Sequence, residues 1–228
     1  MAGIQVAIDG PASSGKSTVA KIIAHCFNYV YVDTGAMYRS VTLAALNRGI
    51  DLADQDALTR LAEQIKISFQ PSADGQRVFI DGQEVTTEIR TPKVASQVST
   101  VAAVSGVRQA LVEAQRQLAK TGGVVMDGRD IGTTVLPTAP VKIFLVASAH
   151  ERARRRYNEN VAKGIPTAPL AELQKQIELR DQKDSTRKVS PLVQAADAIK
   201  VDTTKMSIEQ VVVRISQLIE KKLKEIAE

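Results

Sequence analysis

The stretch IDGPASSGKSTVAKII at residues 8–23 decides the fold of this chain. Residues 10–17 match the pattern G-x-x-x-x-G-K-[ST], in which a glycine-rich turn joins a strand to a helix. The first N–H groups of that helix converge on one point, and the helix dipole adds positive potential there. The sequence therefore predicts a phosphate-binding loop.

The side chains of this loop have distinct expected tasks. Gly10 and Gly15 permit a close backbone approach that a Cβ atom would block. Lys16 can reach the β- and γ-phosphates of a nucleotide, and the Ser17 hydroxyl can ligate Mg²⁺. The residues expected to hold the donor nucleotide are Gly10, Pro11, Ala12, Ser13, Ser14, Gly15, Lys16, Ser17 and Thr18.

Bulk composition limits the class of protein. The 228 residues suffice for one domain, and 44% hydrophobic with 24% charged residues is ordinary for a soluble globular chain. No apolar run approaches the roughly 18 residues of a membrane span, and residues 1–10 do not resemble a signal peptide. The single cysteine, Cys26, fits a reducing cytoplasm. A net charge of +5 suits phosphorylated partners, whereas 4% aromatic residues offer little base stacking for nucleic acid.

Short apolar, β-branched runs followed by helical patterns recur along the chain. Because such runs are typical of strands covered on both faces, they predict an α/β fold with a parallel sheet. The predicted strands are 4–9, 30–33, 124–127, 142–146 and 199–202.

Two helices flank this predicted sheet in the sequence. The buried face of the first is expected to consist of Val19, Ile22, Ile23 and Cys26, with His25 exposed. The last helix is expected to begin with a capping box formed by Ser207 and Gln210. Its apolar side is expected to hold Val211, Ile215, Leu218 and Leu223.

The stretch 66–85 departs from the α/β rhythm and reads as three short strands. Asp-Gly pairs favour positive φ, so turns are expected at 73–76 and at 81–83. We expect a small antiparallel meander inserted between the second and third strands of the main sheet. Helices over about 93–103 and 106–120 are predicted to follow it.

Polar residues cluster where two of the predicted parallel strands end. These residues are Asp33, Thr34 and Arg39 in segment 30–40, and Asp127, Arg129 and Asp130 in segment 124–133. The carboxyl ends of parallel strands form the ligand-binding edge of such sheets. We therefore expect both clusters to contribute to the site of the phosphate loop.

Arginine is concentrated in the later segments 150–160 and 178–188. Phosphoryl transfer between two anions needs such cations, because two unit charges about 4 Å apart repel by about 4 kcal/mol at an effective dielectric constant of about 20. The intervening segment, 160–173, contains two prolines and a glycine and is predicted to form a flap over the site.

The donor nucleotide is predicted to be ATP. A guanine-binding Asn-Lys-x-Asp sequence is missing, because none of the four asparagines is followed by lysine. The Leu-Ser-Gly-Gly-Gln sequence of ABC-type ATPases is missing as well. A small-molecule kinase is the class that remains.

Several longer segments occur in one order along nearly the whole chain: IDGPASSGKST, DTGAMYR, MDGRDIGT, PVKIFLVAS, LRDQKDSTR and PLVQAADAIKVDTT. Together with the meander they resemble the bacterial cytidylate kinases. The resemblance implies a monomeric cytoplasmic enzyme, without nucleic-acid or membrane partners, that uses ATP and Mg²⁺ to phosphorylate CMP or dCMP. It also implies a P-loop three-layer fold with a five-stranded parallel sheet.

The resemblance implies a single kinase domain, residues 1–228, with three parts. The core would comprise 1–36, 121–150 and 188–228. The monophosphate-binding lobe would span about 37–120, with the β-insert at 65–86, and a mobile lid would span about 151–187.

The same resemblance assigns site residues. Those implied near the acceptor phosphate and sugar are Asp33, Thr34, Arg39, Arg129, Arg180, Asp184 and Arg187. Those implied to read the cytosine edge are Ser99, Arg108 and Asp130. The implied catalytic cations are Lys16, Arg129, Arg155, Arg156 and Arg187.

The expected chemistry needs no general base, because the second pKa of a phosphate monoester lies near 6. A carboxylate such as Asp130 can accept from the cytosine amino group, whereas the uracil carbonyl would face it unfavourably. Two alternatives stay open. One is a kinase of the same fold with an alcohol acceptor, which would need a base such as Asp33. The other is a non-catalytic ATP- or RNA-binding module, supported only by the net charge.

Overall fold

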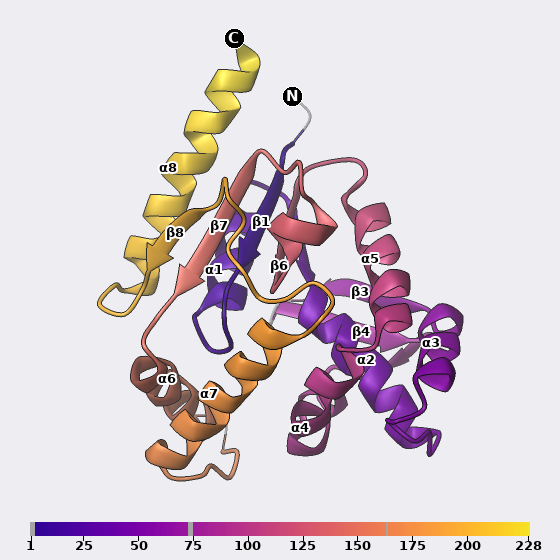
Figure 1. Ribbon diagram of the computed structural model, residues 1–228. Helices are drawn as coiled ribbons and strands as arrows, with labels where there is room; N and C mark the ends of the chain where they lie inside the picture. Colours follow the sequence, from indigo (N-terminus) through magenta and orange to yellow (C-terminus); the bar gives the residue numbers. More distant parts are fainter. Residues whose placement is uncertain (1–2, 73–74, 163) are drawn as a thin grey trace. The chain divides into compact units, whose positions relative to one another are not determined.

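The computed structural model describes residues 3–72, 75–162 and 164–228. They fall into two compact units, which are drawn in one ribbon in Figure 1. The first unit joins the chain up to Tyr31 with Thr121–Glu228, and the second is Val32–Lys120. Because the first unit is assembled from two distant segments, the second is an insertion within it.

A five-stranded sheet forms the centre of the first unit. Its strands are β1 (Gln5–Asp9), β2 (Val30–Asp33), β6 (Val124–Gly128), β7 (Val141–Val146) and β8 (Ile199–Asp202), in the order β2-β6-β1-β7-β8. The last two residues of the edge strand β2 already belong to the second unit. β1 pairs in parallel with β6 and with β7, and β7 pairs in parallel with β8. The predicted α/β fold with its parallel sheet is confirmed, and every predicted strand lies within one residue of an observed one.

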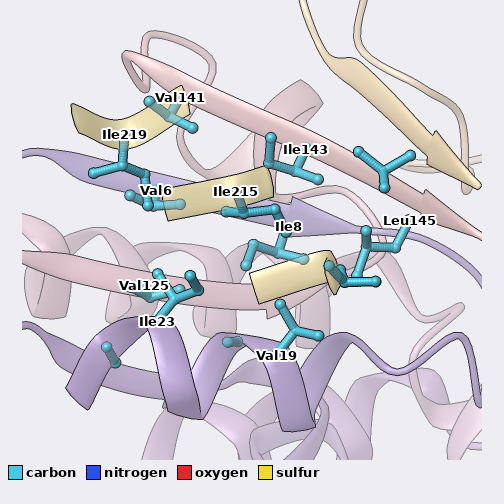
Figure 2. Packing of buried hydrophobic residues seen from close by; sticks show 14 of the residues in the cluster. Val6, Ile8, Val19, Ile23, Val125, Val141, Ile143, Leu145, Ile215 and Ile219 are labelled. Atoms are coloured by element: carbon cyan, nitrogen blue, oxygen red, sulfur yellow. The ribbon is translucent and has the colours of Figure 1, made fainter. Parts of the chain in front are cut away.

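The hydrophobic core of the first unit lies between this sheet and two helices, α1 (Lys16–Cys26) and α8 (Ile208–Ala227). Figure 2 shows Ile23 of α1 and Ile215 of α8 close to the strand residues Val6 and Ile8. These side chains are completely buried or nearly so, and each contributes about 1.5–3 kcal/mol by leaving water. The predicted capping box at the start of α8 is confirmed, because Ser207 and Gln210 each bond the other's backbone.

The predicted buried face of α1 was partly wrong. Ile22 and Cys26 are exposed, and the helix instead buries Val19, Ala20, Ile23 and Ala24. These four residues follow the i, i+1, i+4, i+5 spacing of one helical stripe, and Lys16 lies on the same stripe one turn earlier. The small side chains of Ala20 and Ala24 lie against the sheet. The helix is therefore rotated about its axis relative to the orientation that a buried Ile22 and Cys26 would require.

Two further helices of the first unit form a hairpin, α6 (Ala149–Ala162) and α7 (Leu170–Thr186). They share a small core of Ala153, Leu173 and Ile177. This hairpin occupies most of the segment for which a lid is predicted.

The described residues of the second unit form four helices and a three-stranded antiparallel sheet, which confirms the predicted meander. The helices are α2 (Thr34–Asn47), α3 (Gln55–Gln64), α4 (Pro92–Val101) and α5 (Ser105–Ala119), and a short 3₁₀ turn covers Glu88–Arg90. The strands are β3 (Ile67–Ser72), β4 (Gly75–Ile80) and β5 (Gln83–Glu84). The predicted turn after Ile80 is confirmed by the positive φ of Asp81 and Gly82. The other turn was predicted at 73–76; residues 73–74 lie outside the described residues, and Gly75 and Gln76 already belong to β4.

Candidate active site

The phosphate loop connects β1 to α1 and contains three residues with positive φ, Gly10, Ser13 and Gly15. A Cβ atom on Gly10 would lie 2.0 Å from the carbonyl oxygen of Leu145 in β7. The close approach at this glycine is therefore made to the neighbouring strand of the sheet. Ser13 adopts φ 58, so this position takes the left-handed conformation without a glycine.

Lys16 is a buried cation inside the loop. Its Nζ donates to the Pro11 carbonyl oxygen at 2.7 Å and to Ser14 Oγ at 3.4 Å. Burial, assisted by the nearby Arg129, lowers the pKa of Lys16 to about 7, although Asp127 and Asp9 act in the opposite direction. An anionic ligand would favour the charged form of this lysine.

Asp127, at the carboxyl end of β6, lies beside the loop. Its two carboxylate oxygens accept hydrogen bonds of 2.8 Å from the hydroxyl groups of Ser17 and Tyr31. The sequence predicted that Asp127 contributes to the site of the phosphate loop, but it did not predict which side chains this aspartate bonds. Sheet register was the missing signal, because Ile8 of β1 pairs with Asp127 and thus brings β6 beside the loop.

Arginine and aspartate side chains from the end of β6 and from α7 pair with each other. Arg129 Nε donates to Asp184 Oδ2 at 3.0 Å, and Arg187 Nη2 lies 3.4 Å from Asp130 Oδ1. Burial alone would raise the pKa of Asp184, but Arg129, Arg180 and Arg187 outweigh it and hold this pKa below its usual value. The structure thus gathers the first unit's predicted acceptor residues into one charged cluster.

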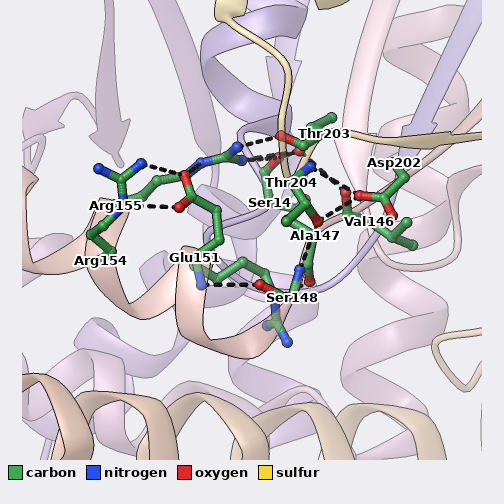
Figure 3. A network of polar contacts seen from close by, with 11 residues as sticks. Ser14, Val146, Ala147, Ser148, Glu151, Arg154, Arg155, Asp202, Thr203 and Thr204 are labelled. Carbon is green, nitrogen blue, oxygen red and sulfur yellow. Dashed lines mark hydrogen bonds and ion pairs between the residues drawn. The ribbon is translucent and has the colours of Figure 1, made fainter.

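Arg155 lies on α6 and reaches back to the phosphate loop. It donates to the carbonyl oxygens of Ser14 and Thr203 and pairs with Glu151 one turn earlier on the same helix, as Figure 3 shows. Arg156, its neighbour, pairs with no carboxylate among the residues that the structure describes.

Arg152 is a residue of this region to which the sequence assigned no role. Its buried guanidinium donates to the carbonyl oxygens of Ala12 and Ala147 and forms an ion pair of 2.6 Å with Asp181 of α7. The arginine-rich pattern predicts cations here, but it does not show that Arg152 is buried.

The other predicted acceptor residues belong to the second unit. Asp33 caps α2 by accepting from the Ala36 N–H at 2.8 Å, and it pairs with Arg39 and Arg90. An aspartate held by two guanidinium groups is poorly suited to act as a general base.

Arg108 is a buried arginine of the same unit. It donates to the Ala102 carbonyl oxygen at 3.2 Å and lies over the ring of Tyr38. Thr34 is buried at the start of α2, and Ser99 is partly buried on α4. The residues predicted to read cytosine are therefore divided, with Ser99 and Arg108 in the second unit and Asp130 in the first.

The described residues show neither a clustered metal site nor a membrane span. Across residues 3–72, 75–162 and 164–228, no group of three or more His, Cys, Asp or Glu side chains is arranged to hold a metal ion. None of the helices in those ranges has the length and apolarity of a membrane span. The site thus combines a phosphate loop with converging lysine and arginine side chains, which suits the binding of phosphate groups and the stabilisation of their charge.

Comparison with known proteins gives concordant results. Residues 6–221 match the family model described as cytidylate kinase. The chain is 68% identical to the cytidylate kinase of Limosilactobacillus reuteri (strain DSM 20016) over 99% of both chains. It is 67% identical to that of Limosilactobacillus fermentum over 98% of both. An uncharacterized protein from Eubacterium ventriosum, of solved structure, shares the fold with a TM-score of 0.52 at 12% identity, over 96% of this chain and 98% of that one.

Proposed function

Since this chain belongs to the cytidylate kinase family, we propose that its phosphate loop and charged cluster carry out phosphoryl transfer from ATP to CMP or dCMP. The products are ADP and CDP or dCDP. The observation that carries the proposal is the near full-length family match on a chain whose buried Lys16 lies within a phosphate loop.

Residues 10–18 are proposed to bind the ATP phosphates, with Lys16 beside the group that is transferred. Mg²⁺ would arrive with ATP as part of the substrate. Ser17 and Asp127 fit it, because they offer a hydroxyl and a carboxylate oxygen 2.8 Å apart, and Mg²⁺ prefers few protein oxygens together with water and phosphate. When bound, Mg²⁺ neutralises part of the phosphate charge.

The acceptor nucleotide is proposed to contact the aspartates and arginines assigned from the family. In the first unit these are Arg129, Asp130, Arg180, Asp184 and Arg187; in the second they are Asp33, Thr34, Arg39, Ser99 and Arg108. The Asp130 carboxylate would accept from the cytosine amino group, while Arg108 donates to the ring acceptors. Uracil presents a carbonyl at the amino position, so Asp130 would disfavour it.

The rate enhancement is proposed to come from positioning and charge. The acceptor phosphate is mostly deprotonated at pH 7 and needs no base. Lys16, Arg129, Arg156 and Arg187 would stabilise the charge that develops on the transferred group. Arg155 is proposed to act from the lid, and its bonds to Ser14 and Thr203 support a place beside the phosphate loop.

We further propose that the enzyme is a cytoplasmic monomer. One cysteine, a net charge of +5 and few aromatic residues support a protein of the reducing cytoplasm that acts on small phosphorylated molecules. Sedimentation equilibrium is expected to give a mass near 24.6 kDa.

The deciding experiment measures ADP release after separate addition of CMP, dCMP, UMP and AMP, with an alcohol such as shikimate as a further acceptor. CMP and dCMP are expected to react. UMP is expected to have a kcat/KM lower by about tenfold or more, because an unpaired buried polar group costs about 1–3 kcal/mol. Equal efficiency with UMP would refute the assignment of Asp130, and turnover of the alcohol alone would refute the proposed reaction.

A further inference from the structure

Asp9 is a buried carboxylate at the end of β1, immediately before Gly10 of the phosphate loop. Only 4% of this residue is exposed. Its Oδ1 accepts from the N–H of Ile131 at 2.8 Å, and its Oδ2 accepts from the N–H of Gly132 at 2.7 Å. One side chain thus engages two successive peptide groups that lie far away in the sequence.

Those two N–H groups belong to the turn that holds Asp130 in place. They open a short π-helix, η2 (Ile131–Val135), whose first N–H groups have no acceptor within the helix. On the other side, the Asp130 carbonyl oxygen accepts from Thr134 at 2.8 Å and from Val135 at 3.2 Å. The backbone at Asp130 is therefore fixed by η2 after it and by Asp9 across the sheet.

The surroundings of Asp9 make this contact costly to maintain. Burial raises the pKa of its carboxyl group to about 6, although the N–H groups of Gly132 and Ile131 oppose the rise. The neighbouring charges are Asp130, which raises this pKa, and Lys16, which lowers it. The two N–H groups that this buried acid binds directly follow the proposed acceptor residues Arg129 and Asp130, which points to a task in the reaction.

We propose that Asp9 is a positioning residue for acceptor recognition. By fixing the peptides of Ile131 and Gly132 it holds the Asp130 carboxylate, and with it Arg129, at a constant place relative to the phosphate loop. Asp9 itself touches neither nucleotide. The inference rests on the proposed function, specifically on the role of Asp130 in reading cytosine.

The test compares the ratio of kcat/KM for CMP to that for UMP in the wild type and in Asp9→Asn. The amide retains one acceptor oxygen but turns an N–H donor toward a peptide N–H, so one of the two bonds is lost. We expect the ratio to fall by about tenfold, as loss of one charge-assisted hydrogen bond implies, while the KM for ATP changes by less than about twofold. Asp54→Asn, the same change at the exposed cap of α3, is the matched control and should leave both quantities unchanged.

The double variant Asp9→Asn/Asp130→Asn separates positioning from general damage. If Asp9 acts through Asp130, Asp9→Asn should change the ratio little once Asp130 is already altered. Suppose that Asp130→Asn alone lowers the ratio of kcat/KM for CMP to that for UMP. If Asp9→Asn then leaves this ratio unchanged and only slows turnover of both acceptors, the inference is overturned. If Asp130→Asn leaves the ratio unchanged, the proposed role of Asp130 is wrong, and the inference about Asp9, which depends on that role, is wrong as well.

Gly132→Ala provides a second route if Asp9→Asn does not fold. Its Cβ would lie 3.2 Å from Cδ of Lys142, which is closer than side chains usually pack, and at an ordinary 3.4 Å from Asp9 Oδ2. Because Lys142 is buried and held by Asp197 at 2.7 Å, part of the adjustment falls on the Gly132 peptide that bonds Asp9, while both carboxylates remain. We expect a severalfold lower ratio with a normal circular dichroism spectrum. An unchanged ratio in this folded variant would also count against Asp9 as a positioning residue.

Discussion

Lys16 and Asp9 are opposite charges buried at the two ends of the phosphate loop. Burial moves both pKa values toward the neutral form, to about 7 for the lysine and to about 6 for the aspartate. Each charge is satisfied by the backbone, since Lys16 donates to a loop carbonyl and Asp9 accepts from two amide groups. Such groups are costly for stability, so their value lies in what they hold in place.

Replacing Lys16 by methionine is expected to lower kcat by about a hundredfold or more, because a preorganised donor to the transition state is lost. The measurement is steady-state ADP formation at saturating CMP. Lys221→Met, at a side chain that is 76% exposed on α8, is the control and should keep wild-type turnover. A loss below threefold in Lys16→Met would contradict the proposed role.

Asp9 is expected to make the stability of the chain depend on pH between about 4 and 6. Its folded-state pKa of about 6 lies above the usual 3.8, so the folded chain holds a proton there that the unfolded chain releases. The contribution of Asp9 to the free energy of unfolding is therefore fully present below about pH 4. It is lost as the pH rises through about 6, which lowers the free energy of unfolding by about 3 kcal/mol. Urea unfolding of wild type and Asp9→Asn at several pH values should show that the free energy of unfolding of the wild type falls relative to that of the variant as pH rises. A difference that stays constant, or that grows with pH, would contradict the raised pKa.

At the scale of elements, the strands and caps were predictable because local signals specify them. Apolar β-branched runs gave every strand of the main sheet, Asp-Gly gave the turn at 81–83, and Ser207 with Gln210 gave the start of α8. The orientation of α1 was not predictable, because Ile22 and Cys26 satisfy helical spacing as well as Ala20 and Ala24 do, and only contact with the sheet decides between them.

The candidate site was likewise predictable only in part. The phosphate loop was evident from its motif, whereas the pairs Asp9–Ile131, Ser17–Asp127 and Arg152–Asp181 join segments that only sheet register and helix packing bring together. The individual roles of the acceptor residues stay predictions.

Arg152 connects three elements, and its loss is expected to destabilise the first unit. Arg152→Gln would leave Asp181 without its ion-pair partner and remove bonds to two carbonyl oxygens. Breaking a buried pair costs about 3–5 kcal/mol, and the partial exposure of Asp181 favours the lower end. Urea unfolding followed by circular dichroism should show this loss. Arg154→Gln, on the same helix but exposed, should show no measurable change, and equal effects would contradict a structural link at Arg152.

At the scale of the whole molecule, the chain contains separate hydrophobic cores in its two units. One core joins α1, α8 and the main sheet. The clusters of the second unit join α2 to α3, α4 and α5, and to the small sheet. Among the described residues these clusters have no buried residue in common, so we expect the two units to open separately.

ATP is therefore expected to protect backbone amides unequally in hydrogen exchange. At a concentration of about 100 times Kd, a ligand adds about 2.7 kcal/mol to the unit that binds it, which slows exchange by about a hundredfold where opening releases the ligand. We expect this effect in α1 and β7, and less than about twofold slowing in α3 of the second unit. Equal protection in both units would mean that they unfold as one.

The division of the first unit into two stretches has a consequence for synthesis on the ribosome. β1 is the middle strand, but its partners β6 and β7 emerge only after the whole second unit has been made. At roughly 5–20 residues per second, this apolar strand spends on the order of ten seconds without a partner. A ribosome that stalls before Val124 would thus hold a nascent chain in which β1 has neither neighbouring strand, a ready target for chaperones and proteases.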